Sequence, residues 1–227
     1  MKKKLCKTFF LIAALLFLCS CRNVPFEYED LCELNENMPL KAYDLPQWQS
    51  IALQANVVLD SPFNTTSFIC MLQVSGNKLA LAAMLPAGVK FLEITGSSQK
   101  AEKWYFMPGF IEDEAEQKKM ANALLQDFSR IFLHERFLYP GKLPGAELER
   151  SKYCIGLYFP EKGEKRFYAG KLLRLVKKSV KNKDCNWQTE YFRCNVSNDR
   201  IYPDRIVYEN KRSGYSLILR VDDFQAE

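Results

Sequence analysis

The chain has 227 residues, of which 48% are hydrophobic and 26% are charged, and its formal net charge is +5. Four of its 32 Lys and Arg residues lie before residue 8, and the 28 that remain nearly balance the 27 acidic residues. This balance excludes a nucleic-acid-binding protein that relies on a strong positive field. The length suits one domain with a full hydrophobic core.

The first 20 residues have the pattern of a signal peptide. The basic start MKKKLCK precedes an apolar run from Phe9 to Cys19, which is shorter than the roughly 20 residues of a membrane-spanning helix. The run ends in Leu-Cys-Ser-Cys, which resembles the bacterial lipobox and marks Cys21 as the predicted lipidation site; the alternative is an ordinary secretory leader. Several acyl chains such as palmitate would hold the protein stably to a membrane.

The residues that follow predict the domain boundaries and the location. Residues 21–40 are acidic and contain two prolines, which favours a lipidated tether between a leader at 1–20 and a domain at 41–227. Arg22 stands where an aspartate retains many lipoproteins in the inner membrane. We therefore expect the periplasmic face of the outer membrane.

The cysteines indicate no metal site. Five remain beside Cys6, Cys19 and Cys21, and no two of the eight form a Cys-x-x-Cys pair, so zinc and thioredoxin-type chemistry have little support. Cys185 and Cys194 could close a hairpin as a disulfide, or they could be two buried free thiols. We predict no catalytic residue, no metal and no cofactor; the single histidine, His134, is interpreted as structural.

The first half of the domain has the pattern of an antiparallel meander. Five β-rich runs are separated by short turns of Gly, Pro, Ser and Asn, at 51–59, 67–74, 78–85, 89–95 and 102–107. In the second and third runs, apolar residues occupy both the odd and the even positions, whose side chains point to opposite faces of a sheet. We therefore expect both faces of this sheet to be covered.

An amphipathic helix is predicted from 112 to about 137, and it ends before Tyr139-Pro140-Gly141. Acidic residues begin it, and bulky apolar residues recur at three and four positions on one face; they are Met120, Leu124, Phe128, Ile131 and Phe132. The helix either packs on the sheet as core or covers a ligand.

Further strands are predicted at 152–159, 166–176, 187–196, 204–210 and 214–221. The chain is thus mainly β (α+β), with about ten strands in a curved antiparallel sheet that forms an unclosed β-barrel, and the inserted helix is its lid or plug. The basic run 171–183 has six cations, which either touch anionic head groups or form a solvated face.

Two stretches, NKLALAAMLPAGVKFLEIT and DRIVYENKRSGYSLILRV, together with the helix between them, resemble the LolA/LolB-like lipoprotein-carrier superfamily over residues 50–222. Within this superfamily, the amino-acid sequence most resembles an uncharacterised family of bacterial outer-membrane lipoproteins with a domain of unknown function. The resemblance implies a concave apolar face that holds acyl chains, lined here by Leu72, Leu79, Leu81, Phe91, Trp104, Phe106, Leu124, Phe128, Tyr215 and Leu217.

The resemblance also implies a turn that contacts the membrane, formed here by Leu85-Pro86-Ala87-Gly88. Leu85 and Ala87 are its candidate contacts, although Ala87 stands where LolB-type domains project a leucine. We expect a monomeric, lipid-anchored carrier or acceptor of hydrophobic or acylated cargo such as a lipid or lipoprotein. The alternative is an accessory scaffold with a self-filled cavity that binds protein partners. An enzyme is disfavoured because no nucleophile elbow, P-loop or dinucleotide fingerprint occurs.

Overall fold

The computed structural model describes residues 50–98, 100–132, 147–150, 154–169, 174–197 and 200–226. All of them lie in one compact unit, Cys32–Glu227. The predicted leader, the tether and Cys21 lie outside the described residues. The helix is α2 (Glu114–Phe132), and the strands are β1 (Ser50–Asp60), β2 (Thr65–Ser75), β3 (Lys78–Met84), β4 (Lys90–Ser97), β5 (Ala101–Phe106), β6 (Glu147–Arg150), β7 (Cys154–Phe159), β8 (Glu164–Ala169), β9 (Arg174–Lys181), β10 (Asn186–Ser197), β11 (Arg200–Asn210) and β12 (Tyr215–Ala226).

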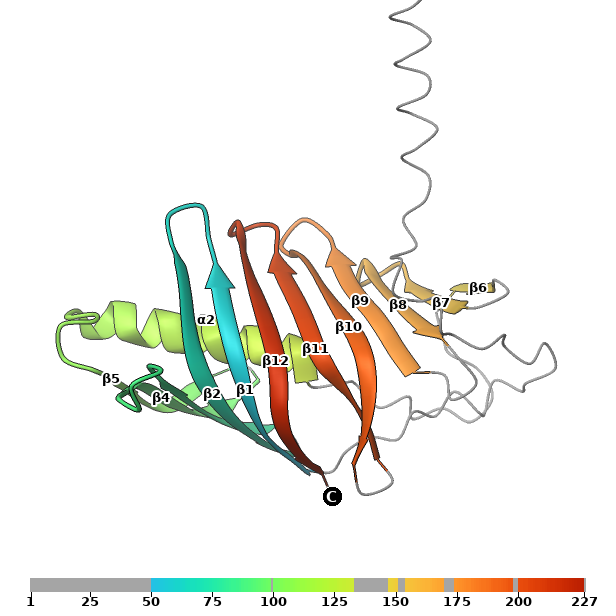
Figure 1. Ribbon diagram of the computed structural model, residues 1–227. Coiled ribbons are helices and arrows are strands. Elements are labelled where there is room, and N and C mark those ends of the chain that lie inside the picture. The colour runs from blue at the N-terminus through green and yellow to red at the C-terminus, as the bar shows by residue number, and fades with distance from the viewer. Residues whose placement is uncertain are drawn as a thin grey trace, which may run out of the picture. The chain divides into compact units, whose positions relative to one another are not determined.

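These strands form one antiparallel sheet in the order β5-β4-β3-β2-β1-β12-β11-β10-β9-β8-β7-β6. The first and last strands meet in its middle, where Ile51 lies opposite Ala226. Figure 1 shows the sheet curving around α2, which crosses behind β2, β1 and β12. Strands β5 and β6 remain as its two ends, so the barrel is unclosed. The predicted fold class is therefore confirmed.

The elements differ from the prediction at three places. The run 166–176, predicted as one strand, belongs to two, because β8 ends at Ala169 and β9 begins at Arg174, with Tyr168 opposite Leu175. Strand β6 was not predicted. The helix begins two residues later than expected, and the breaker after it and His134 lie outside the described residues.

One face of each central strand is buried against α2. In β2, Cys70, Leu72 and Val74 are buried, whereas Met71 between them is 48% exposed. In β3, the buried residues are Leu79, Leu81 and Ala83. The expectation that both faces of these strands are covered is therefore wrong. Two alanines, two methionines and an isoleucine on the outer face made the sequence look apolar on both sides; they are Ala80, Ala82, Met71, Met84 and Ile69.

Asp113 fixes the start of α2. Its side-chain Oδ1 accepts the backbone N–H of Glu116 at 2.8 Å, and its carbonyl accepts the N–H of Gln117 at 2.9 Å. This is the N-cap arrangement that satisfies otherwise unpaired N–H groups in the first turn. Glu114 and Glu116 in this turn add favourable charge.

Candidate functional site

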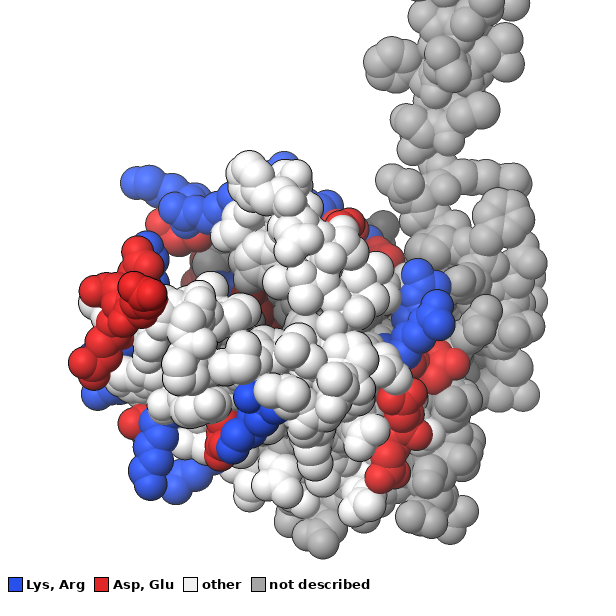
Figure 2. Space-filling view, turned by 60° about the vertical axis from the view of Figure 1, so that its left-hand side comes forward, with Lys and Arg blue, Asp and Glu red and all other residues white. Residues whose placement is uncertain are grey.

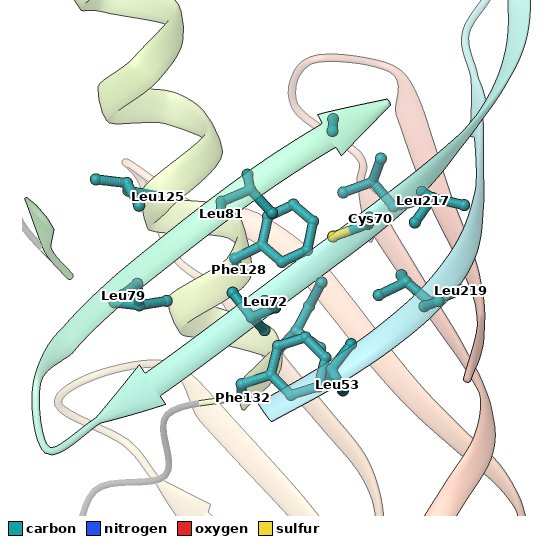
Figure 3. Close-up of a cluster of buried hydrophobic side chains, with 14 of the residues drawn as sticks. Leu53, Cys70, Leu72, Leu79, Leu81, Leu125, Phe128, Phe132, Leu217 and Leu219 are labelled. Atoms are coloured by element: carbon teal, nitrogen blue, oxygen red, sulfur yellow. The ribbon is translucent and has the colours of Figure 1, made fainter. Parts of the chain in front are cut away.

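The predicted cavity residues do come together, but they fill the space between sheet and helix. Seven of the ten are at most 7% exposed, and Trp104, Leu124 and Tyr215 are partly buried against the same cluster. Figure 3 shows the rings of Phe128 and Phe132 pointing from α2 toward the side chains of β1, β2 and β3. In this conformation the predicted cavity is a packed hydrophobic core.

The helix lies close to the sheet on a face slightly rotated from the predicted one. Ala121, Leu125, Phe128 and Phe132 are buried, whereas Met120 is 41% exposed. Gly96 in β4 makes the close approach possible, because a Cβ there would lie 2.9 Å from Leu125 Cδ1 and 2.3 Å from the Lys100 carbonyl oxygen. Asn122 Oδ1 adds a hydrogen bond from the backbone N–H of Ala101, at 2.8 Å.

A pocket remains at the C-terminal end of α2, between the helix and strands β1, β10, β11 and β12. Its volume is about 10 Å³, which is about the room that one water molecule needs. This volume is far below the roughly 300–1,000 Å³ of typical small-molecule sites, so the pocket is nearly closed. Its walls are apolar apart from one phenol; they are Leu53, Ile131, Phe132, Tyr191, Pro203, Ile206, Val221 and Phe224.

A buried carboxylate attaches α2 to the middle of the sheet. Asp127 is 1% exposed, and its Oδ1 accepts hydrogen bonds from the Tyr208 hydroxyl at 2.5 Å and from Arg130 Nη1 at 2.8 Å. The Tyr215 hydroxyl donates to Oδ2. Arg130 Nη1 also donates to Tyr208 Oη at 3.1 Å, and its guanidinium lies 5.6 Å from the centre of the Trp187 ring. Charge-assisted bonds of this kind are the stronger ones in proteins.

The phenols of this network are held in their neutral form. Burial, followed by repulsion from the Asp127 carboxylate, raises the pKa values of Tyr208 and Tyr215 well above their usual range. Burial alone would lower the pKa of Arg130, but the Tyr208 oxygen and Asp127 outweigh it, so the pKa of Arg130 is raised. Arg130 therefore stays charged beside Asp127, and the phenols act as hydrogen-bond donors.

Sequence reasoning missed Asp127, Tyr208 and Arg130. The sequence contained a sign of this network. Asp127 interrupts the apolar stripe of the helix directly before Phe128, at a position where an acidic side chain would have to be buried. A second connection joins the helix end to β10, where the Tyr191 hydroxyl donates to the Ile131 carbonyl at 2.6 Å. Burial raises the pKa of Tyr191 far above its usual range.

The predicted membrane-contacting turn is a tight hairpin. The N–H of Gly88 donates to the Leu85 carbonyl at 2.8 Å, and Gly88 has a φ of 81°. Leu85 packs against the core, while Ala87 is exposed. Three further apolar side chains are exposed at this end of the sheet: Phe63, at 97%, Val89 and Phe110. Figure 2 shows a largely uncharged face that a basic side chain crosses beside an acidic one, with most of the other Lys, Arg, Asp and Glu toward its margins.

The predicted disulfide is wrong. Residues 186–197 form one continuous strand, with Cys185 just before it and Cys194 near its far end. Nine residues of extended chain span about 30 Å, whereas a disulfide needs Cα atoms within about 7 Å. Cys185 is a free thiol, and so is Cys70, whose burial raises its pKa to about 12.

The described ranges contain neither a metal-binding cluster nor a membrane-spanning helix. No group of three or more His, Cys, Asp and Glu side chains lies within reach of one metal ion. Across the same residues, no helix is both long and apolar enough to span a bilayer.

Three solved structures are similar to this fold. A DUF1329 family protein from Desulfovibrio piger ATCC 29098 aligns with a TM-score of 0.50 and 10% identity, covering 82% of this chain and 92% of that one. The LolA superfamily protein NE2245 from Nitrosomonas europaea aligns at 0.49 with 15% identity, covering 83% and 91%. A putative outer membrane lipoprotein-sorting protein domain from Vibrio parahaemolyticus aligns at 0.44 with 12% identity, covering 82% and 88%.

No protein-family model and no curated protein matches the chain by sequence. These solved structures are 10–15% identical to the chain. At these identities the likeness concerns the fold alone. The chain shares its fold with the DUF1329 family protein, and in this chain that fold is an unclosed antiparallel sheet wrapped around one helix.

Proposed function

We propose that this protein is a lipid-anchored periplasmic lipoprotein that binds a hydrophobic or acylated cargo between its sheet and α2. It acts as a carrier or acceptor at the outer membrane. The apolar pocket at the end of α2 is the observation that carries this proposal, because it lies where helix and sheet separate. Removing an alkyl chain from water there gains about 0.8 kcal/mol for each buried CH2 group, so no catalytic group is required.

The pocket observed here would be the closed state of the site. A long acyl chain needs far more room than about 10 Å³, and the added room lies under α2, where Phe128 and Phe132 pack on the sheet. Cargo would displace the helix from its C-terminal end, since that end borders the pocket. The hydrogen bonds of Asp127 then set how much free energy this opening costs.

The alternative is an accessory scaffold that binds protein partners, and the filled core favours it. The residues expected to line a cavity pack against one another, which a scaffold would also show. The two functions differ in whether the protein takes up a ligand.

Native mass spectrometry with lipid extraction separates them. The sample is residues 21–227 with Cys21→Ser, prepared without detergent, which contains the whole compact unit. Val221→Phe, which places a ring in the pocket, should abolish a co-purifying acylated molecule. Met71→Phe on the exposed outer face should retain it. A clean apo mass with no uptake of added fatty acid or lipopeptide would refute the carrier function and favour the scaffold.

The exposed turns at one end of the sheet are the proposed contact with the membrane surface. Phe63 and Ala87 sit on neighbouring turns there, and Phe63 has nearly its whole ring in water. The turn that carries Phe63 is held by hydrogen bonds between Ser61 and Asn64. In vesicle co-sedimentation with the unlipidated chain, Phe63→Ser should weaken binding, whereas Met71→Ser should not. Equal binding by the two variants would exclude this surface.

A further inference from the structure

Three hairpin turns lie side by side at the end of the sheet that carries Phe63. They are the β1–β2 turn (61–64), the β11–β12 turn (211–214) and the β9–β10 turn (182–185). The first two are in contact, because a Cβ at Gly214 would lie 3.8 Å from Pro62 Cγ. The third neighbours the second, because β10 pairs with both β9 and β11. Figure 1 shows the three turns together along the upper edge of the sheet, where they form a single surface, the turn surface.

The turn surface changes from apolar to basic along its length. The β1–β2 turn has no charged residue and projects Phe63, which is 97% exposed. The acid before this turn, Asp60, accepts a hydrogen bond from the Thr65 hydroxyl at 2.6 Å. The other two turns and the end of β9 carry four exposed cations: Lys181, Lys183, Lys211 and Arg212.

Fewer acidic residues stand beside these cations. Asp184 lies in the β9–β10 turn, and Glu209 lies on β11 with its carboxylate 3.8 Å from Lys211 Nζ. The neighbouring turn, 160–163, has one acid and one cation, so it leaves the balance unchanged. Glu209 is two residues behind Lys211, about 7 Å along a strand, and long Lys and Arg side chains extend farther from the backbone than an aspartate. The outermost charges of the two basic turns are therefore mainly positive.

The basic run 171–183 contributes its last residues to this surface. Lys177 pairs with Glu190 at 2.5 Å, and Lys178 is 6% exposed, so these two are engaged within the protein. Lys183, in contrast, is exposed in the turn. The cations of the β11–β12 turn complete the group, although no sequence pattern connects them to the run.

Hydrogen bonds hold the basic turns in place. The N–H of Arg212 donates to the Asn186 carbonyl at 3.3 Å, and its Nη1 donates to the Asp184 carbonyl. Within the β9–β10 turn, Asn182 Oδ1 accepts the N–H groups of Asp184 at 2.9 Å and of Cys185 at 2.7 Å. Because the backbone of these turns is already fixed, binding to a partner costs little further ordering.

An exposed aromatic ring beside several cations fits a membrane surface with anionic lipids. The strength of such binding rises with the apolar area that enters the interface and with the attraction between basic side chains and anionic head groups. Each Lys or Arg close to an anionic membrane strengthens binding about fivefold. The turn surface offers both contributions at one end of the sheet.

The proposed anchor at Cys21 permits this orientation. Strand β1 begins at Ser50, at the opposite end of the sheet, and its 11 residues span about 35 Å. Residues 21–49 are long enough to reach about 95 Å when extended. The turn surface can therefore face the same membrane that holds the lipid.

We propose that the turn surface binds membranes that contain anionic lipids, with Phe63 in the head-group region and Lys183, Lys211 and Arg212 against the anionic head groups. This inference rests on the proposed membrane contact and names the class of lipid that it takes. Phe63 supplies affinity for any bilayer, and the cations select among lipids.

The test compares vesicles of phosphatidylcholine with vesicles that contain about one third phosphatidylglycerol. Co-sedimentation is measured with residues 21–227 carrying Cys21→Ser. In about 0.1 M salt we expect about tenfold tighter binding to the anionic vesicles. In about 1 M salt, where the Debye length falls to about 3 Å, most of this preference should be lost.

A double variant locates the site, and a second double variant is its matched control. Lys183→Gln with Lys211→Gln should reduce the preference for anionic vesicles to about twofold or less and leave binding to phosphatidylcholine unchanged. Lys78→Gln with Lys100→Gln removes the same charge from exposed positions at the opposite end of the sheet and should keep the full preference. Phe63→Ser should weaken binding to both kinds of vesicle by the same factor. Circular dichroism confirms that each variant folds.

The outcomes distinguish this inference from the proposed membrane contact. Equal binding of the unsubstituted chain to the two kinds of vesicle, with Phe63→Ser still weakening it, would overturn the lipid preference and leave the membrane contact intact. A preference that survives in the first double variant, or that the control also loses, would overturn the assignment to the turn surface. A preference that salt does not change would overturn its electrostatic cause. Binding to neither kind of vesicle would refute the membrane contact together with the inference.

Discussion

Replacing Tyr208 by Phe tests how α2 is held to the sheet. The substitution removes only the hydroxyl that donates to Asp127 Oδ1 at 2.5 Å, and the ring keeps its contact with Trp187 at 6.1 Å between centroids. Tyr208 is 0% exposed, so water does not replace the hydroxyl. A hydrogen bond to a charged group contributes about 1.5–3 kcal/mol. We expect the free energy of unfolding to fall by about 2 kcal/mol.

The same change should favour cargo. If α2 must leave the sheet before an acyl chain enters, a weaker attachment raises the apparent affinity by up to about 30-fold for 2 kcal/mol. Urea unfolding followed by circular dichroism measures the first effect, and fatty-acid titration measures the second. Hydrogen exchange along Glu114–Phe132 should accelerate in the variant.

Tyr105→Phe is the matched control. Its ring is 43% exposed on β5, so removing its hydroxyl should change stability by less than about 0.5 kcal/mol. If Tyr208→Phe lowers the free energy of unfolding by less than about 0.5 kcal/mol and leaves the slope of its dependence on urea concentration unchanged, Asp127 does not hold the helix. A lower stability without any gain in affinity would show instead that the helix does not open for cargo.

Three further predictions follow from burial. Gly96→Ala should lower the free energy of unfolding by about 1–3 kcal/mol in urea unfolding, because its Cβ would meet the Lys100 carbonyl oxygen at 2.3 Å; an unchanged midpoint would contradict the close approach of helix and strand. Stability should fall as pH rises above 10, since Tyr168, Tyr191, Tyr208 and Tyr215 have pKa values raised from 10.0 in the folded state, so that unfolding releases protons there. Urea midpoints between pH 9 and 12 measure this, and a flat profile would refute the burial of these phenols. A maleimide should modify Cys185 before Cys70 in the folded protein, because Cys70 is 0% exposed and its pKa is about 12; equal rates by peptide mapping would disprove that order.

Much of the architecture could be predicted from the chain alone. Strands separated by Gly, Pro and Asn turns and a single amphipathic segment were enough to predict a curved antiparallel sheet with an inserted helix. The hairpin β8–β9 was missed because RFYAGKLLRLV contains no strong turn signal beyond one glycine. The disulfide failed for a similar reason, since no pattern distinguishes one long strand from a hairpin between Cys185 and Cys194.

The site was predicted less well than the fold. Apolar residues were assigned correctly to the interior, yet composition cannot distinguish a packed core from an open cavity. Seven of the ten candidates belong to the core, and the other three pack against it. The buried charges were missed altogether. Lys178 and Lys177 cannot be told apart in the basic run 171–183. The register of β9 determines that Lys178 points to the interior and Lys177 to the surface. Asp127 was overlooked because an acid on a helix is usually at the surface.

The pairing of β1 with β12 determines when the sheet can be completed during folding. The strand that joins the two parts of the sheet is the last in the chain, and its partner Ile51 precedes Ala226 by almost the whole domain. Contacts so distant in sequence form late and slow folding. A chain cut or stalled before Tyr215 would leave β1 without its neighbour and expose a long unpaired strand edge. When the chain emerges from its N-terminal side first, the sheet can close only after residues 215–226 are free to pair, and until then the open edge of β1 is exposed to aggregation.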